Sequence, residues 1–184
     1  RSTFMVQKVI ITNRADCCAN RLANFVIGVT NDSPQVSVPA LSNYRVCASL
    51  RSDMKAGERR KFDCEANAQY VIIQLATRNY LTLCEVEVYG TKRVCESLKF
   101  PMKRCEAPEV EAPANANLAL GKQAYQLNMG WGGLPARATD GNRNPSWGGA
   151  TCTHTQLAPN PWWAVDLEEV TKISRVVLTN RQDC

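Results

Sequence analysis

The sequence predicts an all-β protein, built as an antiparallel β-sandwich or jelly roll. Short segments rich in β-branched residues recur along the chain, clusters of turn residues separate them, and helical periodicity is weak throughout. With 184 residues, the chain is long enough to bury a core for one sizeable domain or slightly more.

The strand candidates follow one another along the chain. Residues 25–30 (FVIGVT) and 70–75 (YVIIQL) are apolar runs, and residues 83–90 (LCEVEVYG) alternate apolar and acidic side chains, as a half-buried strand does. The basic stretch 51–62 is broken by acidic residues, which predicts a solvated surface loop. In PWWAVDL, which precedes a last strand at KISRVVL, we expect one of Trp162 and Trp163 in the core and the other partly exposed.

One segment of the sequence occurs twice. Residues 1–17 (RSTFMVQKVIITNRADC) are echoed by residues 168–184 (EEVTKISRVVLTNRQDC), and both copies lead β-branched residues into a polar Thr-Asn-Arg-x-Asp turn. Residues 91–114 are rich in proline and charge and predict a linker, which Cys95 and Cys105 would clip into a small loop. The copies lie 167 positions apart, so we interpret residues 1–90 and 115–184 as two halves of a domain, split or permuted across the chain.

The cysteine content predicts an extracellular protein. Nine cysteines with no CxxC pair and a single histidine do not form a zinc site, and that many thiols favour an oxidising compartment. Because nine is odd, one cysteine lacks a partner inside the chain, and Cys184 is the candidate. The start at Arg1 has neither methionine nor a signal core, and no apolar run approaches the roughly 18 residues that span a bilayer, so we expect a processed or excised soluble segment.

Composition argues against two other classes of protein. The net charge is +5, but the basic residues are not interleaved with aromatic ones, so we do not expect nucleic-acid binding. Asp166, Glu168 and Glu169 have the spacing of a solvated strand end rather than of a glycosidase pair, and no GxSxG elbow occurs. We therefore do not expect an enzyme.

The spacing around the single histidine points to a known family. A gap of 26 residues separates His154 from Arg181 of the second repeat copy, and in the first copy four residues separate Asp16 from Arg21. Read across the two copies, the pattern is histidine, gap, Arg-x-Asp, four residues, arginine, and it resembles the signature of the F-type lectins (fucolectins), a discoidin-like β-sandwich family. The segments NLALGKQA, RATDGNRN, CTHT, NPWWAVDL and YLTLCEVEVYG are similar to further landmarks of that family.

The resemblance implies a sugar site. Arginine forks and an imidazole would donate hydrogen bonds to pyranose hydroxyls, with an aspartate orienting the arginines, although the same aspartate suits an ordinary Asx turn equally well. Adjacent cysteines would ordinarily pair elsewhere, but the family implies a vicinal disulfide that packs against the methyl-bearing face of L-fucose. The implied sugar-binding residues are His154, Arg14, Arg21, Arg181, Asp16, Cys17 and Cys18.

The same resemblance implies two disulfides and a Ca²⁺ site. The disulfides would be Cys47 with Cys64, and Cys84 with Cys152. Calcium would brace the loop that carries His154 without touching the sugar, although by spacing alone DGNRN is an ordinary turn without the carboxylate density of an EF-hand. The implied ligands are Arg137 and Cys84 through their carbonyls, with Asp140, Asn142, Thr151 and Glu85.

Two functions fit these observations. The first is a calcium-containing, fucose-binding lectin that recognises fucosylated glycans as part of a secreted, tandem-repeat protein, in innate immunity or in cell adhesion. The alternative is a structural or adhesive repeat protein whose lectin-like domains associate end to end without needing glycan. The sequence leaves three arrangements open: a window cut from a longer tandem protein, closure of the two halves within one chain, and exchange of halves between chains.

Overall fold

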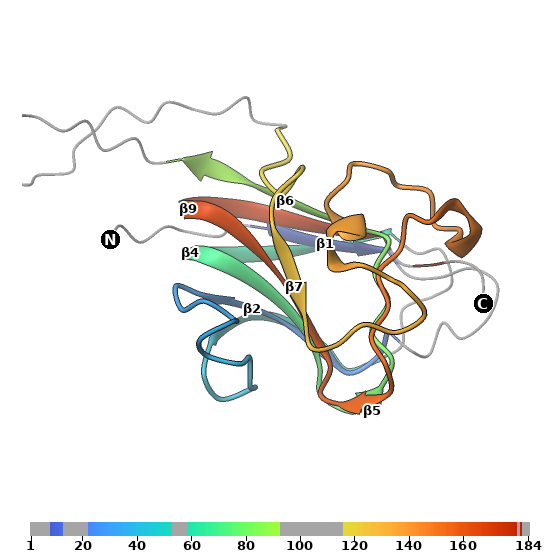
Figure 1. The fold of residues 1–184 in the computed structure, drawn as a ribbon. Coiled ribbons are helices and arrows are strands. Elements are labelled where there is room, and N and C mark those ends of the chain that lie inside the picture. Colours follow the sequence, from blue (N-terminus) through green and yellow to red (C-terminus); the bar gives the residue numbers. More distant parts are fainter. Residues whose placement is uncertain (1–7, 13–21, 53–58, 93–115, 180, 182–184) are drawn as a thin grey trace, which may run out of the picture.

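The protein is all-β, as the sequence predicts (Figure 1). The computed structural model describes residues 8–12, 22–52, 59–92, 116–179 and 181. Over this part of the chain the only helices are two short 3₁₀ turns, η2 (Pro135–Ala138) and η3 (Trp147–Gly149). The strands are β1 (Lys8–Thr12), β2 (Phe25–Thr30), β3 (Arg45–Leu50), β4 (Arg59–Leu75), β5 (Arg78–Asn79), β6 (Glu85–Lys92), β7 (Ala124–Gln126), β8 (Ala158–Pro159) and β9 (Trp162–Thr179).

Two long antiparallel strands, β4 and β9, form the centre of the fold. Their register runs from Gln74 opposite Trp162 to Lys61 opposite Val177, with irregularities near the middle of β4. β2 and β7 flank one half of this pair, and β1 and β6 flank the other. Figure 1 shows both long strands bending at the same end of the molecule, so that their halves lie in two layers. Bulged strands that pass from one sheet to the other are how β-sandwiches form such corners.

The core lies between these two layers. It contains Phe25, Ile73 and Val165 from one side and Val86 and Val176 from the other, each at most 1 % exposed. These residues come from both sides of the 91–114 segment, so the chain before it and the chain after it share one core. Burying a side chain of this size typically contributes about 1.5–3 kcal/mol, which makes the shared core the main source of stability.

The two copies of the repeated segment lie beside each other. β1 runs parallel to the end of β9, with Ile10 opposite Val177 and Thr12 opposite Thr179, which are equivalent positions of the two copies. Ile10 and Val177 also share one partner on β4, Lys61. The two copies therefore register on the same stretch of β4, while the division of the chain into two half-domains stays a prediction.

Three details differ from the sequence-based expectations. Trp162 and Trp163 are both buried, at 6 % and 0 % exposure, because β7 packs alongside the start of β9. The predicted loop 51–62 ends early, since β4 already begins at Arg59 and pairs with β1. The acidic side chains of β6 do not face solvent: Glu85 and Glu87 are 1 % and 0 % exposed, because the 140–146 loop contributes residues that contact this face of the strand.

Candidate functional site

His154 lies on a short extended segment held between two loops. The backbone N–H groups of Thr153 and Thr155 donate to the carbonyls of Leu83 and Leu81, at 2.8 and 3.1 Å. On the other side, His154 N–H donates to the Gly133 carbonyl at 3.2 Å. The backbone of His154 is therefore fixed on both sides, and its side chain is 3 % exposed.

The hydrogen bond of the imidazole determines what its other nitrogen offers. Nδ1 lies 2.5 Å from the Thr155 carbonyl oxygen. A carbonyl only accepts, so Nδ1 carries the proton, and in the neutral ring Nε2 is then an acceptor. Protonation of Nδ1 makes Nε2 an acceptor in the neutral ring, and the donor role expected for His154 in a sugar site stays a prediction.

Aromatic rings and arginines gather around this histidine, and we call Tyr80, Arg137, Trp147, His154 and Arg181 the histidine cluster. Tyr80 and Trp147 meet the imidazole in edge-to-face contacts, with ring centroids 5.5 and 5.6 Å away. The guanidinium carbons of Arg181 and Arg137 lie 4.5 and 5.7 Å from the centroid of a Trp147 ring, within cation–π range. All members except His154 are partly exposed, so the cluster presents polar edges to solvent.

A disulfide explains why Arg181 reaches this histidine. Cys84 is bonded to Cys152, which stands two residues before His154. The backbone N–H of Cys84 donates to the carbonyl of Thr179, the last residue of β9 and two residues before Arg181. The predicted pairings of Cys84 with Cys152 and of Cys47 with Cys64 are both confirmed. The disulfide joins the start of β6 to the histidine segment, and the backbone hydrogen bond of Cys84 adds the end of β9.

The remaining predicted sugar-binding residues belong to the first repeat copy. These residues lie outside the part of the chain that the structure describes: Arg14, Asp16, Cys17, Cys18 and Arg21. Of the predicted set, the structure therefore brings together His154 and Arg181. Sequence reasoning missed Tyr80 and Trp147, since neither belongs to a recognisable motif and their proximity to His154 depends on the tertiary fold.

The residues expected to bind calcium converge at the start of β6. The Glu85 side chain is buried, and neither of its carboxylate oxygens has a hydrogen-bond partner. Burial, followed by the negative charges of Asp140 and Glu87, raises the pKa of Glu85 to about 8. An unpaired buried carboxylate is costly, so this arrangement favours either a proton or a cation at Glu85.

The neighbouring loop is shaped by three successive Asx turns. The side-chain oxygens of Asp140, Asn142 and Asn144 each accept a hydrogen bond from the backbone N–H two residues later, at 2.7 to 3.0 Å. The Thr151 hydroxyl closes the loop by donating to the Asn144 carbonyl at 2.5 Å. Among the described residues no three His, Cys, Asp or Glu side chains form a metal cluster. The expected set has only two carboxylates and relies otherwise on carbonyl, amide and hydroxyl oxygens, which are ligands of a hard cation.

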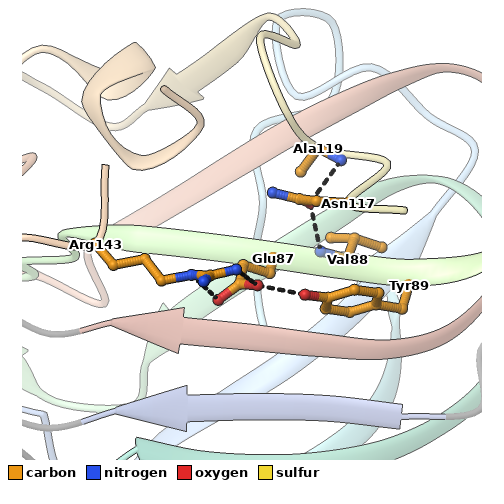
Figure 2. A network of polar contacts seen from close by, with 6 residues as sticks. All are labelled: Glu87, Val88, Tyr89, Asn117, Ala119 and Arg143. Carbon is orange, nitrogen blue, oxygen red and sulfur yellow. Dashed lines mark hydrogen bonds and ion pairs between the residues drawn. The ribbon is translucent and has the colours of Figure 1, made fainter. Parts of the chain in front are cut away.

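Glu87, two residues further along β6, pairs with Arg143. Arg143 Nε donates to its Oε1 at 2.9 Å, and Arg143 Nη2 to its Oε2 at 2.6 Å (Figure 2). The Tyr89 hydroxyl also donates to this carboxylate. Hydrogen bonding and the charge of Glu87 raise the pKa of Arg143 above its usual value. This bidentate pair anchors the 140–146 loop to the sheet, and the sequence alone offered no sign of it.

The fold and this cluster define a disulfide-linked β-sandwich module with a polar, aromatic-lined candidate site. The family model of the NedA-like, galactose-binding domain matches residues 137–184. Fucolectin-5 of Anguilla japonica is 44% identical over 73 residues, which cover 37% of this chain and 39% of that protein. Fucolectin-1 of the same species is 49% identical over 51 residues, covering 28% and 29%. The Pentraxin fusion protein of Xenopus laevis is 34% identical over 91 residues, covering 48% and 21%.

Over part of its length the chain is therefore similar to a galactose-binding domain and to proteins named fucolectins. The crystal structure of an F-lectin (fucolectin) from striped bass serum shares 30% identity over 91% of this chain and 50% of that one, with a TM-score of 0.34. The chain covers at most half the length of these fucolectins. No helix over the described ranges is long and apolar enough to cross a membrane.

Proposed function

We propose that this chain is a lectin that binds fucosylated glycans through the histidine cluster. The observation that carries the proposal is the convergence of Arg181, Trp147 and His154, with the Arg181 guanidinium 4.5 Å from the Trp147 ring centroid and the imidazole 5.6 Å away. The names of the fucolectin relatives support fucose as the ligand.

The chemistry of the cluster suits a neutral sugar. A guanidinium stacked on an indole keeps its N–H groups along its edge, where they donate to sugar hydroxyls. Nε2 of the neutral His154 ring accepts a hydrogen bond from a hydroxyl, so Arg181 and His154 together offer one donor group and one acceptor. The aromatic rings of Trp147 and Tyr80 make the surroundings of these groups partly apolar, which suits the methyl group of a 6-deoxy sugar. From the first repeat copy, we propose that Arg14, Arg21 and a Cys17–Cys18 disulfide complete the site, with Asp16 orienting the arginines.

We also propose that Ca²⁺ binds beside Glu85. The support is the buried Glu85 carboxylate, whose oxygens have no hydrogen-bond partner, together with the Asx-turn loop that begins at Asp140. Glu85 and Asp140 would supply carboxylate oxygens, Thr151 its hydroxyl, and Arg137, Cys84 and Asn142 further oxygens. The cation would neutralise Glu85 and hold the 140–151 loop in place. Because Trp147 lies on this loop, calcium would support the sugar site from behind.

A second candidate is an adhesive repeat protein whose lectin-like domains associate end to end. The observation that favours it is the common register of the two repeat copies on β4, since Ile10 and Val177 share Lys61 as a partner. In such an assembly, the matching segment of a neighbouring chain would take the place of one copy on β4. We place the protein outside the cell in either case, in a tandem arrangement, because its disulfides suit an oxidising compartment.

Isothermal titration calorimetry with methyl α-L-fucoside tests the lectin proposal, with the methyl glycosides of galactose and mannose as controls. Arg181→Ala and His154→Ala should each weaken fucoside binding about 10- to 100-fold, because each removes a hydrogen bond of about 1.5–3 kcal/mol. The matched control is Arg78→Ala, which removes an exposed arginine from β5. Equal binding of all three sugars by the wild type, or equal effects of Arg78→Ala and Arg181→Ala, would refute the proposal.

A further inference from the structure

A tight turn stands directly against the histidine segment. Gly130 N–H donates to the His154 carbonyl at 2.8 Å, and His154 N–H donates to the Gly133 carbonyl at 3.2 Å. The Gln126 side chain also donates to both the Gly133 and the His154 carbonyls, at 3.0 and 3.2 Å. A methyl group on Gly133 would lie 2.7 Å from the His154 Cβ atom, so turn and histidine are in contact. The turn is therefore a rigid neighbour of the histidine cluster.

A tryptophan occupies the tip of this turn. Gly133 N–H donates to the Gly130 carbonyl at 2.9 Å, and the two residues between them, Trp131 and Gly132, have φ values of +53° and +71°. Positive φ at both central positions defines a type I′ turn, which favours glycine, asparagine or aspartate. Tryptophan at the first central position is therefore unfavourable for the backbone.

Burial does not compensate for this unfavourable conformation. The Trp131 side chain is 83 % exposed, whereas Trp162 and Trp163 are buried in the sandwich. Trp131 makes no hydrogen bond or ring contact with another described residue. Met129 and Leu134, on either side of the turn, are each 51 % exposed, so the tip carries three exposed apolar side chains within six residues. Three exposed apolar side chains on one hydrogen-bonded turn form a candidate contact surface.

We propose that Trp131 is the platform for a second sugar unit, namely the pyranose to which the terminal fucose of a glycan is attached. The inference rests on the proposed function, because it requires fucose in the histidine cluster. The C–H face of a pyranose is apolar and packs on an indole, whereas its hydroxyls point outward and remain hydrated. The turn is hydrogen-bonded to the backbone of His154, which places the backbone of Trp131 next to the segment that carries the imidazole of the cluster. Trp131 therefore selects fucosylated oligosaccharides over free fucose.

Calorimetry with two ligands tests this assignment, using methyl α-L-fucoside and a trisaccharide that carries fucose on galactose. Trp131→Asn should weaken trisaccharide binding about 3- to 10-fold, the range of one aromatic contact, and leave fucoside binding unchanged. Trp131→Tyr keeps an aromatic ring and should retain most of the trisaccharide affinity. The matched control is Val36→Ala, which removes another exposed apolar side chain, 89 % exposed, from a different loop.

The melting temperature separates a ligand contact from a structural role. Asparagine suits the first central position of a type I′ turn, so Trp131→Asn should melt at the same temperature as the wild type or higher. An equal loss of affinity for both ligands, or no loss for either, would overturn the assignment of Trp131. A wild-type protein that binds neither ligand would refute the proposed function. A wild type that binds both ligands equally would leave the proposed function intact but overturn the assignment of Trp131.

Discussion

Replacing Arg143 by alanine should destabilise the protein strongly, because it leaves a buried carboxylate without its charged partner. The Glu87 side chain is 0% exposed, while that of Arg143 is 60% exposed. In the wild type, the two hydrogen bonds from Arg143 and one from Tyr89 satisfy Glu87 (Figure 2). The substitution removes the bidentate ion pair, so the buried charge of Glu87 loses the two charged hydrogen bonds that Arg143 donates.

The size of the effect follows from this geometry. Breaking a buried ion pair by removing one partner costs about 3–5 kcal/mol. Arg143 approaches Glu87 from the solvent side, so water can partly replace it, and we expect the lower end, about 3 kcal/mol. For a domain of this size that corresponds to a decrease in melting temperature of roughly 6–12 °C. Arg143→Lys keeps the charge but loses the bidentate geometry, so its cost should be intermediate.

Urea denaturation followed by circular dichroism measures these differences, in chelator so that calcium binding makes no contribution. Tyr89→Phe, the control for the hydroxyl alone, should cost only about 1 kcal/mol. Adding Glu87→Gln to Arg143→Ala removes the uncompensated charge and should recover part of the stability. The reasoning is refuted if Arg143→Ala costs less than about 1 kcal/mol, or if Glu87→Gln makes that variant still less stable.

Three further predictions concern the surroundings of the histidine cluster. In chelator, the free energy of unfolding should fall as the pH rises from about 5 to 8, by at most about 1.4 kcal/mol per pH unit. The reason is that the pKa of Glu85 is raised to about 8, so the folded state retains a proton that the unfolded chain has released. Melting curves with calcium, or of Glu85→Gln, should show a weaker pH dependence, and a flat wild-type profile in chelator would contradict this. Gly133→Ala places a methyl group 2.4 Å from the backbone nitrogen of His154, so it should lower both the melting temperature and the affinity for the fucoside. The control Gly148→Ala, whose added methyl group would have its nearest neighbour at 3.8 Å, should change neither. Replacing both cysteines of the Cys84–Cys152 bridge, which are 68 residues apart, should cost about 4 kcal/mol in chemical denaturation, and an unchanged midpoint would show that the bridge does not constrain the chain.

Much of the β structure was predictable because its signals are local. The apolar runs at 25–30 and 70–75 are strands, since β-branched and aromatic residues favour extended backbone wherever they are placed. Both disulfides followed from the family resemblance of the sequence. The burial of β6 was not predictable in the same way. Alternating apolar and acidic residues indicate one buried face, but Glu87 is buried because Arg143, 56 positions away in the sequence, pairs with it.

For the candidate site, the sequence by itself determined which residues to consider. The tertiary structure decided which of them meet and which hydrogen-bonding groups they present. The spacing of His154 and Arg181 is readable as a motif because it is a property of the chain. Their meeting around Trp147 depends on the Cys84–Cys152 bridge and on the pairing of β6 with β9, which are contacts between distant segments. That Nδ1 of the neutral His154 ring carries the proton follows from one hydrogen bond to the Thr155 carbonyl. That bond depends on the orientation of a side chain within the fold, which residue spacing does not encode.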